Sequence, residues 1–427
     1  MDFVAQTLTN TASSFGQMFE VISYVWFIIF PIGLYYLFTV LWMDHIQRRF
    51  AGKKSFVLLE IITPQNIEKS PQPMEALYAG IAGVMKTPNI YEEFLDGYLT
   101  DSFSLELVGT GGEGVHFYIR TPKNFRYLVE AHLYAQYPDM EIREVPDYVE
   151  NVPPVVPNKD WDLWGSDLQL TDPEYLPIKT YRNFEEDVTG KMIDPLAGLI
   201  EIMGQLQRGQ HVWLQYVITP IGEPKSKKMG QEYVQELAGR TSKKKSPFEV
   251  FLSDLGDIVK NVAGGLFSPP EFSSKGEEKK DDQPLEFRLT PGERRVLEAL
   301  ESNVGKNFFN TKVRLVYLGK KEGFDKSTFV SGFMGGMKQF SDMNYNGFKP
   351  NDISKTYANY VMQESRLRYR QRKIFNRYKD RDTDDKKVML STEELATLFH
   401  PPDMMVISPF FEKVSAKRGS APSNLPF

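Results

Sequence analysis

The stretch FVLLEIITP at Phe56–Pro64 has a near repeat, VWLQYVITP, at Val212–Pro220, and this pair decides how the chain is divided. Both stretches are rich in aliphatic and aromatic residues, which favour buried strands. Two further Thr-Pro pairs, at Thr121-Pro122 and Thr290-Pro291, each precede a helical pattern, where Thr can cap the helix and Pro can occupy its first turn. The repeat predicts two related units in a chain of the α+β class.

The first unit occupies residues 55–150. A glycine-rich stretch, Gly109–Gly114, joins two strands, so we interpret it as a hairpin turn; a dinucleotide-binding loop would join a strand to a helix. Along the chain we predict a strand at Ser55–Ile62, a helix at Pro71–Met85, strands at Phe103–Val108 and Val115–Arg120, a helix at Asn124–Gln136 and a strand at Met140–Val145. This β-α-β-β-α-β order is the ferredoxin-like pattern.

The rest of the chain predicts a second ferredoxin-like α/β unit at residues 158–320, with its core at 211–320 and an insertion at 221–283. A helical C-terminal region follows at 321–411, and a polar tail at 412–427. Within the insertion, apolar residues at helical spacing predict an amphipathic helix over Ser246–Phe267. Its apolar stripe favours contact with a partner, and the candidate contact residues are Phe248, Phe251, Leu255 and Ile258.

An uncharged run of 23 residues, Val21–Met43, predicts one transmembrane helix near the N-terminus. Residues 1–20 would form a short extracytoplasmic segment. Because Arg48, Arg49, Lys53 and Lys54 all follow the run, we expect the N-terminus outside and the body of the protein in the cytoplasm. The sequence therefore predicts a single-pass protein of the inner (cytoplasmic) membrane.

The sequence contains no recognisable catalytic or metal-binding pattern. The chain has no cysteine, which excludes thiolate chemistry and Cys-based metal sites, and its five histidines show no ligand spacing. The G-x-x-x-x-G-K-[ST] motif that holds nucleotide phosphates is missing. We expect no enzymatic activity, no cofactor and no metal, although an enzyme acting at the membrane face stays open as an alternative.

One charged feature invites a functional interpretation, the basic helix predicted within Tyr357–Tyr378. Its cationic residues surround a narrow apolar stripe, and the candidate contact residues are Arg366, Arg368, Arg370, Arg372, Lys373 and Arg377. A merely solvated surface is one interpretation. Anionic lipid headgroups or an acidic partner are another, and nucleic acid is a third. The net charge of −5 argues against a protein that binds nucleic acid over its whole surface, but a local basic patch survives that average. Contact with nucleic acid therefore stays possible, although we do not expect it to be direct.

Several segments resemble one family. These are Ser70–Met85, Ile119–Tyr137, Phe348-Lys349-Pro350, Ser391–Pro401 and Ala421–Pro426. Together they resemble the N-terminal, non-ATPase region of membrane-anchored HerA/FtsK-like ATPases described as type IV secretion or conjugative DNA-transfer proteins. In such proteins a P-loop motor would follow a segment like Ser423–Pro426.

The resemblance implies a membrane-anchored, non-enzymatic scaffold that tethers or regulates a separate hexameric P-loop ATPase in a DNA-translocation system. The implied partners are this ATPase and the membrane, and homo-oligomerisation is left open. A stand-alone structural protein with no motor partner is the remaining alternative.

Overall fold

The computed structural model describes residues 27, 30–63, 70–184, 193–222, 290–342 and 345–402, and these residues form an α+β structure around a nine-stranded antiparallel sheet. The strands are β1 (Phe56–Ile62), β2 (Phe103–Thr110), β3 (Gly114–Pro122), β4 (Glu141–Val145), β5 (Trp161–Leu170), β6 (Gln210–Pro220), β7 (Phe308–Lys320), β8 (Phe348–Pro350) and β9 (Val388–Ser391). The α-helices are α2 (Pro73–Ala82), α3 (Arg126–Gln136), α4 (Ala197–Gly204), α8 (Pro291–Val304), α9 (Lys326–Met337), α10 (Gln363–Lys379) and α11 (Thr392–Leu398).

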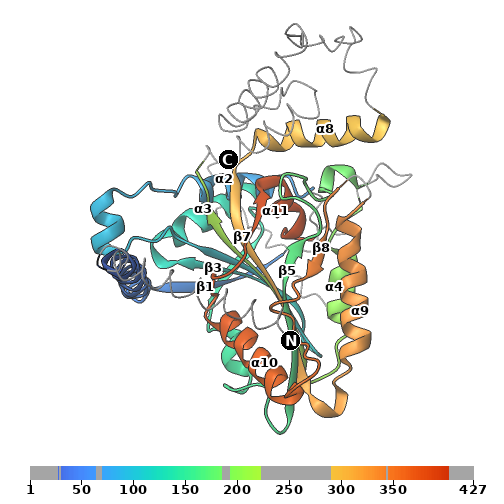
Figure 1. Ribbon diagram of the computed structural model, residues 1–427. Helices are drawn as coiled ribbons and strands as arrows, with labels where there is room; N and C mark the ends of the chain where they lie inside the picture. Colours follow the sequence, from blue (N-terminus) through green and yellow to red (C-terminus); the bar gives the residue numbers. More distant parts are fainter. Residues whose placement is uncertain are drawn as a thin grey trace, which may run out of the picture. The chain divides into compact units, whose positions relative to one another are not determined.

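The sheet consists of two four-stranded halves that meet at the β2–β6 pair (Figure 1). The first half has the order β4-β1-β3-β2, and the second half, followed from its own outer edge, has the order β8-β5-β7-β6. Along the chain each half runs β-α-β-β-α-β, the second with α8 inserted between β6 and β7. Both halves therefore have the ferredoxin-like arrangement. β9 pairs with the first residues of β7.

The repeated stretch that divides the sequence does not mark equivalent strands. Phe56–Ile62 is β1, whereas the later stretch lies in β6 at the junction of the two halves. By position in the sheet, the counterpart of β6 is β2 and that of β1 is β5. The two stretches look alike because strands buried on both faces share near-continuous apolar runs.

The second half extends beyond residue 320, because α9 and β8 complete its β-α-β-β-α-β order. The region expected to be helical, residues 321–411, contains α9, α10 and α11, but it also supplies β8 and β9 to the sheet. β8 has only three residues and pairs with the end of β5, where Leu168 lies opposite Pro350.

The turn of the β2–β3 hairpin contains glycines at which any other side chain would force the backbone to move. Gly112 has a φ of 91° and Gly114 a φ of 103°, the left-handed region that side chains with a Cβ avoid. A Cβ on Gly111 would lie 1.8 Å from the backbone oxygen of Gln207. The turn is therefore pressed against the segment that leads into β6, whose Gln210 carbonyl accepts a hydrogen bond from the Gly111 amide at 2.9 Å.

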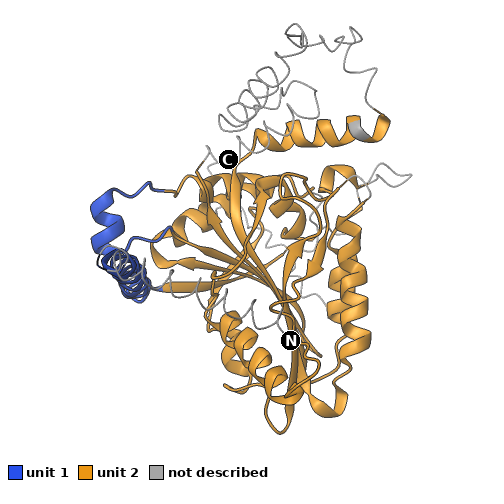
Figure 2. Ribbon diagram, in the orientation of Figure 1, with its two compact units in different colours: residues 1–55, 86–100 blue, residues 56–85, 101–427 orange. Residues whose placement is uncertain are grey.

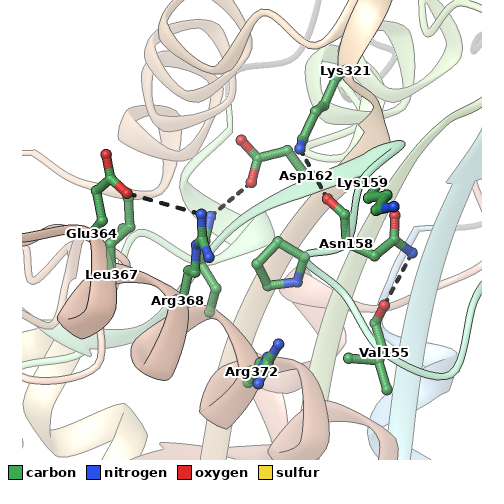
Figure 3. A pocket seen from close by; sticks show the side chains of 11 residues that line it. Val155, Asn158, Lys159, Asp162, Lys321, Glu364, Leu367, Arg368 and Arg372 are labelled. Carbon is green, nitrogen blue, oxygen red and sulfur yellow. Dashed lines mark hydrogen bonds and ion pairs between the residues drawn. The ribbon is translucent and has the colours of Figure 1, made fainter.

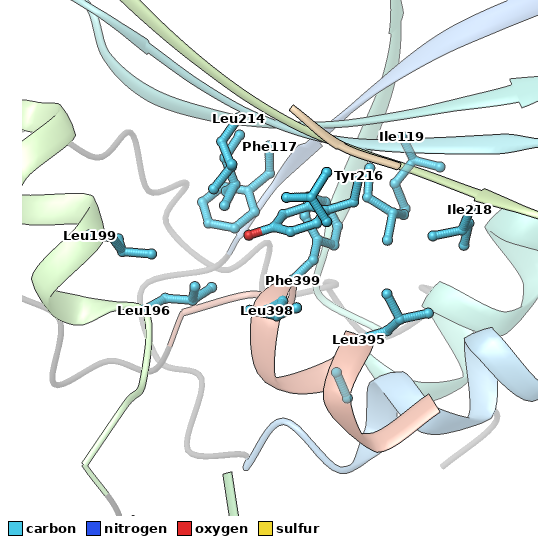
Figure 4. Close-up of a cluster of buried hydrophobic side chains, with 14 of the residues drawn as sticks. Phe117, Ile119, Leu196, Leu199, Leu214, Tyr216, Ile218, Leu395, Leu398 and Phe399 are labelled. Atoms are coloured by element: carbon cyan, nitrogen blue, oxygen red, sulfur yellow. The ribbon is translucent and has the colours of Figure 1, made fainter. Parts of the chain in front are cut away.

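Each face of the sheet carries its own buried core. The larger core joins the sheet to α2, α3, α4, α9 and α11. Figure 4 shows a part of it, where Phe117 of β3 and Tyr216 of β6 face Leu395 and Leu398 of α11. The smaller core lies on the opposite face and joins the sheet to α10. Helices therefore cover both sides of the sheet, which leaves the strands buried on both faces.

Residues 1–55 and 86–100 form a compact unit separate from the rest (Figure 2). Its described part contains a helix over residues 30–51 and a short π-helix, Glu92–Asp96. The Trp42 indole donates a hydrogen bond to the Phe94 carbonyl at 2.8 Å, and Gly97 approaches Ile46 so closely that a Cβ would lie 2.5 Å from its backbone.

The predicted transmembrane helix at Val21–Met43 is contradicted. Among the residues that the structure describes, no helix combines the length and the apolar character that crossing a bilayer requires. Within the described residues, the helix over residues 30–51 continues past the apolar run through Asp44, Arg48 and Arg49. The predicted single-pass topology is corrected with it. Residues 1–26 and 28–29 lie outside the described part.

Candidate functional site

The predicted basic helix is α10, and one side of it is packed against the sheet. The helix follows Met362, whose φ of 54° turns the chain before the first helical residue. Its buried residues, Gln371, Ile374, Phe375 and Tyr378, recur at helical spacing. On the sheet, Trp213 stacks with Phe375 and contacts Tyr378, at ring-centroid distances of 6.3 and 5.1 Å.

A buried ion pair fixes the C-terminal end of α10. Arg381, two residues after the helix, donates hydrogen bonds from Nε to Glu106 Oε1 at 3.0 Å and from Nη2 to Glu106 Oε2 at 3.1 Å. Its Nη2 also donates to Asp147 Oδ1 at 2.9 Å. Burial would raise the pKa of the Glu106 carboxyl, but the charge and hydrogen bonds of Arg381 outweigh burial and hold that pKa below its ordinary value.

Glu106 belongs to a row of buried polar side chains that crosses neighbouring strands in register. In the pairing of the sheet, Glu106 of β2 lies opposite Gln215 of β6, Gln215 opposite Arg314 of β7, and Arg314 opposite Asp167 of β5. Gln215 Nε2 donates to Glu106 Oε1 at 3.0 Å, and Arg314 Nε donates to Asp167 Oδ1 at 2.9 Å. All four side chains are buried, so each depends on these partners for its hydrogen bonds.

The same row holds the backbone that ends α10. Arg314 donates from Nη1 to the carbonyl of Arg377 at 2.7 Å and from Nη2 to the carbonyl of Asp382 at 3.1 Å. Lys312 completes the charge balance, because its Nζ lies 3.0 Å from Asp167 Oδ2. The carboxylates of the row and its cations are thus paired with one another. We interpret the row as the anchor of α10 and not as a reactive centre.

A pocket of about 610 Å³ lies along one side of α10, and we call it the β5–α10 pocket (Figure 3). Its lining comes from the segment before β5, the start of β5, the residue after β7 and α10 itself. Its cations are Lys159, Lys321, Arg368 and Arg372, its carboxylates are Asp162 and Glu364, and its other lining residues are Val155, Pro157, Asn158, Leu367 and Gln371.

A second pocket, of about 230 Å³, lies on the other side of α10. Arg370, Lys373 and Arg377 of the helix line it, together with Asp385 and Lys386. Arg377 is tied within the protein, since it pairs with Asp385 and lies 3.4 Å from Asp382. The carboxyl group of Asp385 has a lowered pKa, chiefly because Arg377 donates a hydrogen bond to it.

Between the two pockets, α10 and the turn before it expose several large side chains. Tyr357, Tyr360, Val361, Met362 and Tyr369 are between 53% and 88% exposed. Arg366 is exposed beside them. We call these six residues the outer face of α10. An exposed group of this kind is unusual for a surface without a partner.

The six predicted contact residues of α10 do not form one surface. Arg368 and Arg372 line the β5–α10 pocket, whereas Arg370, Lys373 and Arg377 line the second pocket, and Arg366 lies on the outer face. Arg370 and Arg366 also donate to backbone carbonyls of the preceding turn, at Lys355 (3.3 Å) and Asn359 (3.1 Å). The helix therefore presents its positive charge in three directions.

The other predicted contact residues, Phe248, Phe251, Leu255 and Ile258, lie outside the described residues, as do the insertion helix and the tail at 412–427.

Sequence reasoning missed the aromatic part of the outer face and the two lysines of the β5–α10 pocket. Tyr357 and Tyr360 come just before the basic run in the sequence, and this position is a signal from which an aromatic part of the surface could have been predicted. Lys159 and Lys321 are far apart in sequence and give no such signal. Lys159 and Lys321 line the same pocket because Trp161 of β5 lies opposite Lys320 of β7 in the sheet. In the described part of the chain, no group of three or more His, Asp and Glu side chains is placed to hold a metal ion.

Comparison with protein families gives one match. The family with the description "Domain of unknown function (DUF8128)" matches residues 54–410, which include both halves of the sheet, α10 and the pockets beside it. A comparison with curated proteins found no match.

Proposed function

We propose that this chain, which belongs to the DUF8128 family, is a non-catalytic docking module that binds an acidic surface of a partner protein through the outer face of α10. The observation that carries the proposal is the concentration of exposed Tyr, Met and Arg side chains on the turn that precedes α10 and on the first turns of this anchored basic helix.

The composition of the outer face matches the centres of protein interfaces. Tyrosine, methionine and arginine are enriched at such centres and supply most of the residues whose loss weakens binding strongly. Tyr360 is the most exposed of the group at 88%, so its ring is available for contact with another molecule. Burying it would remove apolar surface from water and favour association.

The charge of α10 indicates an acidic partner. The helix carries seven Lys and Arg residues and one acidic residue, Glu364, which lies 3.9 Å from Arg368. Arg366 forms no ion pair with a carboxylate among the described residues, and Lys373 lines the second pocket together with Asp385. Opposite charge on the partner would steer the encounter and fix the orientation of the complex.

The rigidity of α10 lowers the cost of binding. Arg381 and Arg314 tie the C-terminal end to the sheet, and Trp213 packs against Phe375 and Tyr378 in the C-terminal half of the helix. Gln371 Nε2 adds hydrogen bonds to Asp162 Oδ1 at 2.8 Å and to the Leu163 carbonyl at 2.6 Å. A helix held in this way needs little further ordering when a partner docks.

The first partner to test is the one that the sequence resemblance implies, a separate P-loop ATPase. The experiment immobilises the full chain and measures its affinity for such an ATPase encoded beside it. The docking variant is Tyr360→Ser with Tyr369→Ser. The matched control is Tyr127→Ser on α3, because Tyr127 is 82% exposed and lies on another element.

We expect the docking variant to raise Kd at least about tenfold, since each interface tyrosine contributes about 1–2 kcal/mol, and the control to leave Kd unchanged. Equal affinities of the docking variant and the wild type would contradict the docking face. A failure of the ATPase to bind the wild type would contradict the choice of partner. If the wild type binds single-stranded DNA and the docking variant does not, the partner of this face is nucleic acid and not a protein.

A further inference from the structure

The β5–α10 pocket is independent of the outer face of α10 and has features of a ligand site. Its four cations come from three separate segments of the chain: Lys159 precedes β5, Lys321 follows β7, and Arg368 and Arg372 lie one helical turn apart on α10. Figure 3 shows all four around the same opening. A merely solvated helix surface would not gather cations from loops distant in sequence.

The charge inside the pocket is not balanced by its own carboxylates. Four cations line the pocket against two carboxylates, Asp162 and Glu364, and Asp162 accepts hydrogen bonds from Gln371 Nε2 and from the Leu163 amide, each at 2.8 Å. Glu364 makes only a 3.9 Å ion pair with Arg368, and both side chains are largely exposed. Within the described part of the chain, Lys159 and Arg372 have no ion pair. The pocket therefore presents excess positive charge.

The walls of the pocket are fixed by hydrogen bonds that do not involve a ligand. Asn158 Oδ1 accepts from the amides of Asp160 and Trp161, at 2.9 and 2.8 Å. The Lys321 amide donates to the Asp160 carbonyl at 2.9 Å, and Lys321 Nζ donates to the Asn158 carbonyl at 2.9 Å. Because hydrogen bonds within the protein already hold the site in place, binding a ligand costs little conformational entropy.

The pocket has a polar side and an apolar side. Two guanidinium groups one turn apart suit phosphate oxygens, which accept paired hydrogen bonds from arginine. Val155, Pro157 and Leu367 supply apolar surface against which a ring can pack. The volume of about 610 Å³ is within the usual range for sites that hold a small organic molecule.

We propose that the β5–α10 pocket binds a phosphate-bearing small molecule of nucleotide size, with its phosphates on Arg368, Arg372, Lys159 and Lys321 and its ring against Leu367. The ligand is recognised by its phosphates, and the apolar wall adds affinity. Binding involves no bond cleavage and needs no P-loop.

The test is isothermal titration calorimetry of the full chain with ATP as the probe, and with tripolyphosphate and adenosine as its separate parts. The pocket variant is Lys159→Gln with Arg372→Gln. The matched control is Lys373→Gln, which removes a positive charge from the next residue of the same helix but lies in the second pocket. Thermal melts of all variants establish that each remains folded.

We expect ATP to bind more tightly than tripolyphosphate, and adenosine to bind at least tenfold more weakly than ATP. The pocket variant should raise Kd for ATP at least tenfold, and Lys373→Gln should change it less than twofold. The proposal is overturned if the wild type binds neither ATP nor tripolyphosphate, if adenosine binds as tightly as ATP, or if the folded pocket variant binds ATP like the wild type.

Discussion

Arg381 and Glu106 form a two-point ion pair, with Nε to Oε1 at 3.0 Å and Nη2 to Oε2 at 3.1 Å, and both side chains are buried. Arg381 itself has a φ of 51°, so the backbone adopts an uncommon conformation where it presents this side chain. The pair joins the end of α10 to β2, although the two residues are 275 positions apart. This buried contact is thus one of the anchors that position the basic helix.

Replacing Arg381 by Met should destabilise the protein by about 3–5 kcal/mol, because it leaves the Glu106 carboxylate buried without its cation. Denaturant unfolding followed by circular dichroism measures the loss. Adding Glu106→Leu to Arg381→Met should restore part of the stability, since an uncharged pair leaves no buried charge behind.

As a control, Arg126→Met removes ion pairs with the partly exposed Glu130 and Glu144 and should cost about 1 kcal/mol or less. A loss for Arg381→Met no larger than that of the control would contradict the anchor.

Stability should depend on the ionisation of Glu106. Its pKa lies below the ordinary value of 4.5 because Arg381 outweighs the effect of burial. A group with a lowered pKa in the folded state stabilises the fold above its unfolded pKa, and this contribution disappears as pH falls through the folded pKa. The free energy of unfolding should therefore decrease as pH falls below about 4.5, and Glu106→Gln should reduce that decrease.

The measurement is a series of denaturant titrations between about pH 6 and about pH 3. Glu364→Gln, which removes a carboxylate that is 89% exposed, serves as the control for a lost negative charge. An identical pH dependence in Glu106→Gln and the wild type would show that Glu106 does not couple folding to pH.

Gly111→Ala should destabilise the fold by about 1–3 kcal/mol, because the added Cβ would overlap the Gln207 backbone oxygen and push the hairpin from β6. The control is Gly332→Ala in α9, where a Cβ meets nothing within 4 Å and the helix should gain up to about 1 kcal/mol. The two changes add the same methyl group, so thermal melts should move in opposite directions. A Gly111→Ala protein as stable as the wild type would contradict the close packing of the turn.

The strands of the first half are accessible to sequence reasoning because their signals are local. An apolar run predicts a strand at Ser55–Ile62, and the structure has β1 at Phe56–Ile62. The glycines at 109–114 predict a turn, and β2 and β3 join there. β8, by contrast, has only three residues and is a strand because it pairs with β5, so no local sequence pattern predicts it.

The transmembrane prediction failed for a different reason. Hydropathy scores a run of residues along the chain, whereas among the described residues no helix has both the length and the apolar character for a span, and the helix of residues 30–51 extends into charged sequence. The repeat at Phe56–Pro64 and Val212–Pro220 failed because burial alone produces similar strands at inequivalent positions.

The candidate site was predictable only in part. The basic run of α10 is contiguous, so its charges are evident in the sequence. The buried row left a weaker signal, a polar residue between apolar neighbours within a strand, such as Glu106 or Gln215. Lys159 and Lys321 come together only through the β5–β7 pairing, which depends on the whole sheet.

The central claim, that the outer face of α10 is where a partner protein docks, is tested most directly by site-specific photocross-linking. A photoreactive phenylalanine analogue replaces Tyr369 in one protein and Tyr127 in another, since both positions expose a tyrosine and lie on different helices. After irradiation with the ATPase, the account predicts a covalent adduct from position 369, mapped to an acidic segment of the partner, and none from position 127. Adducts from position 127 alone, or equal adducts from both positions, would contradict it.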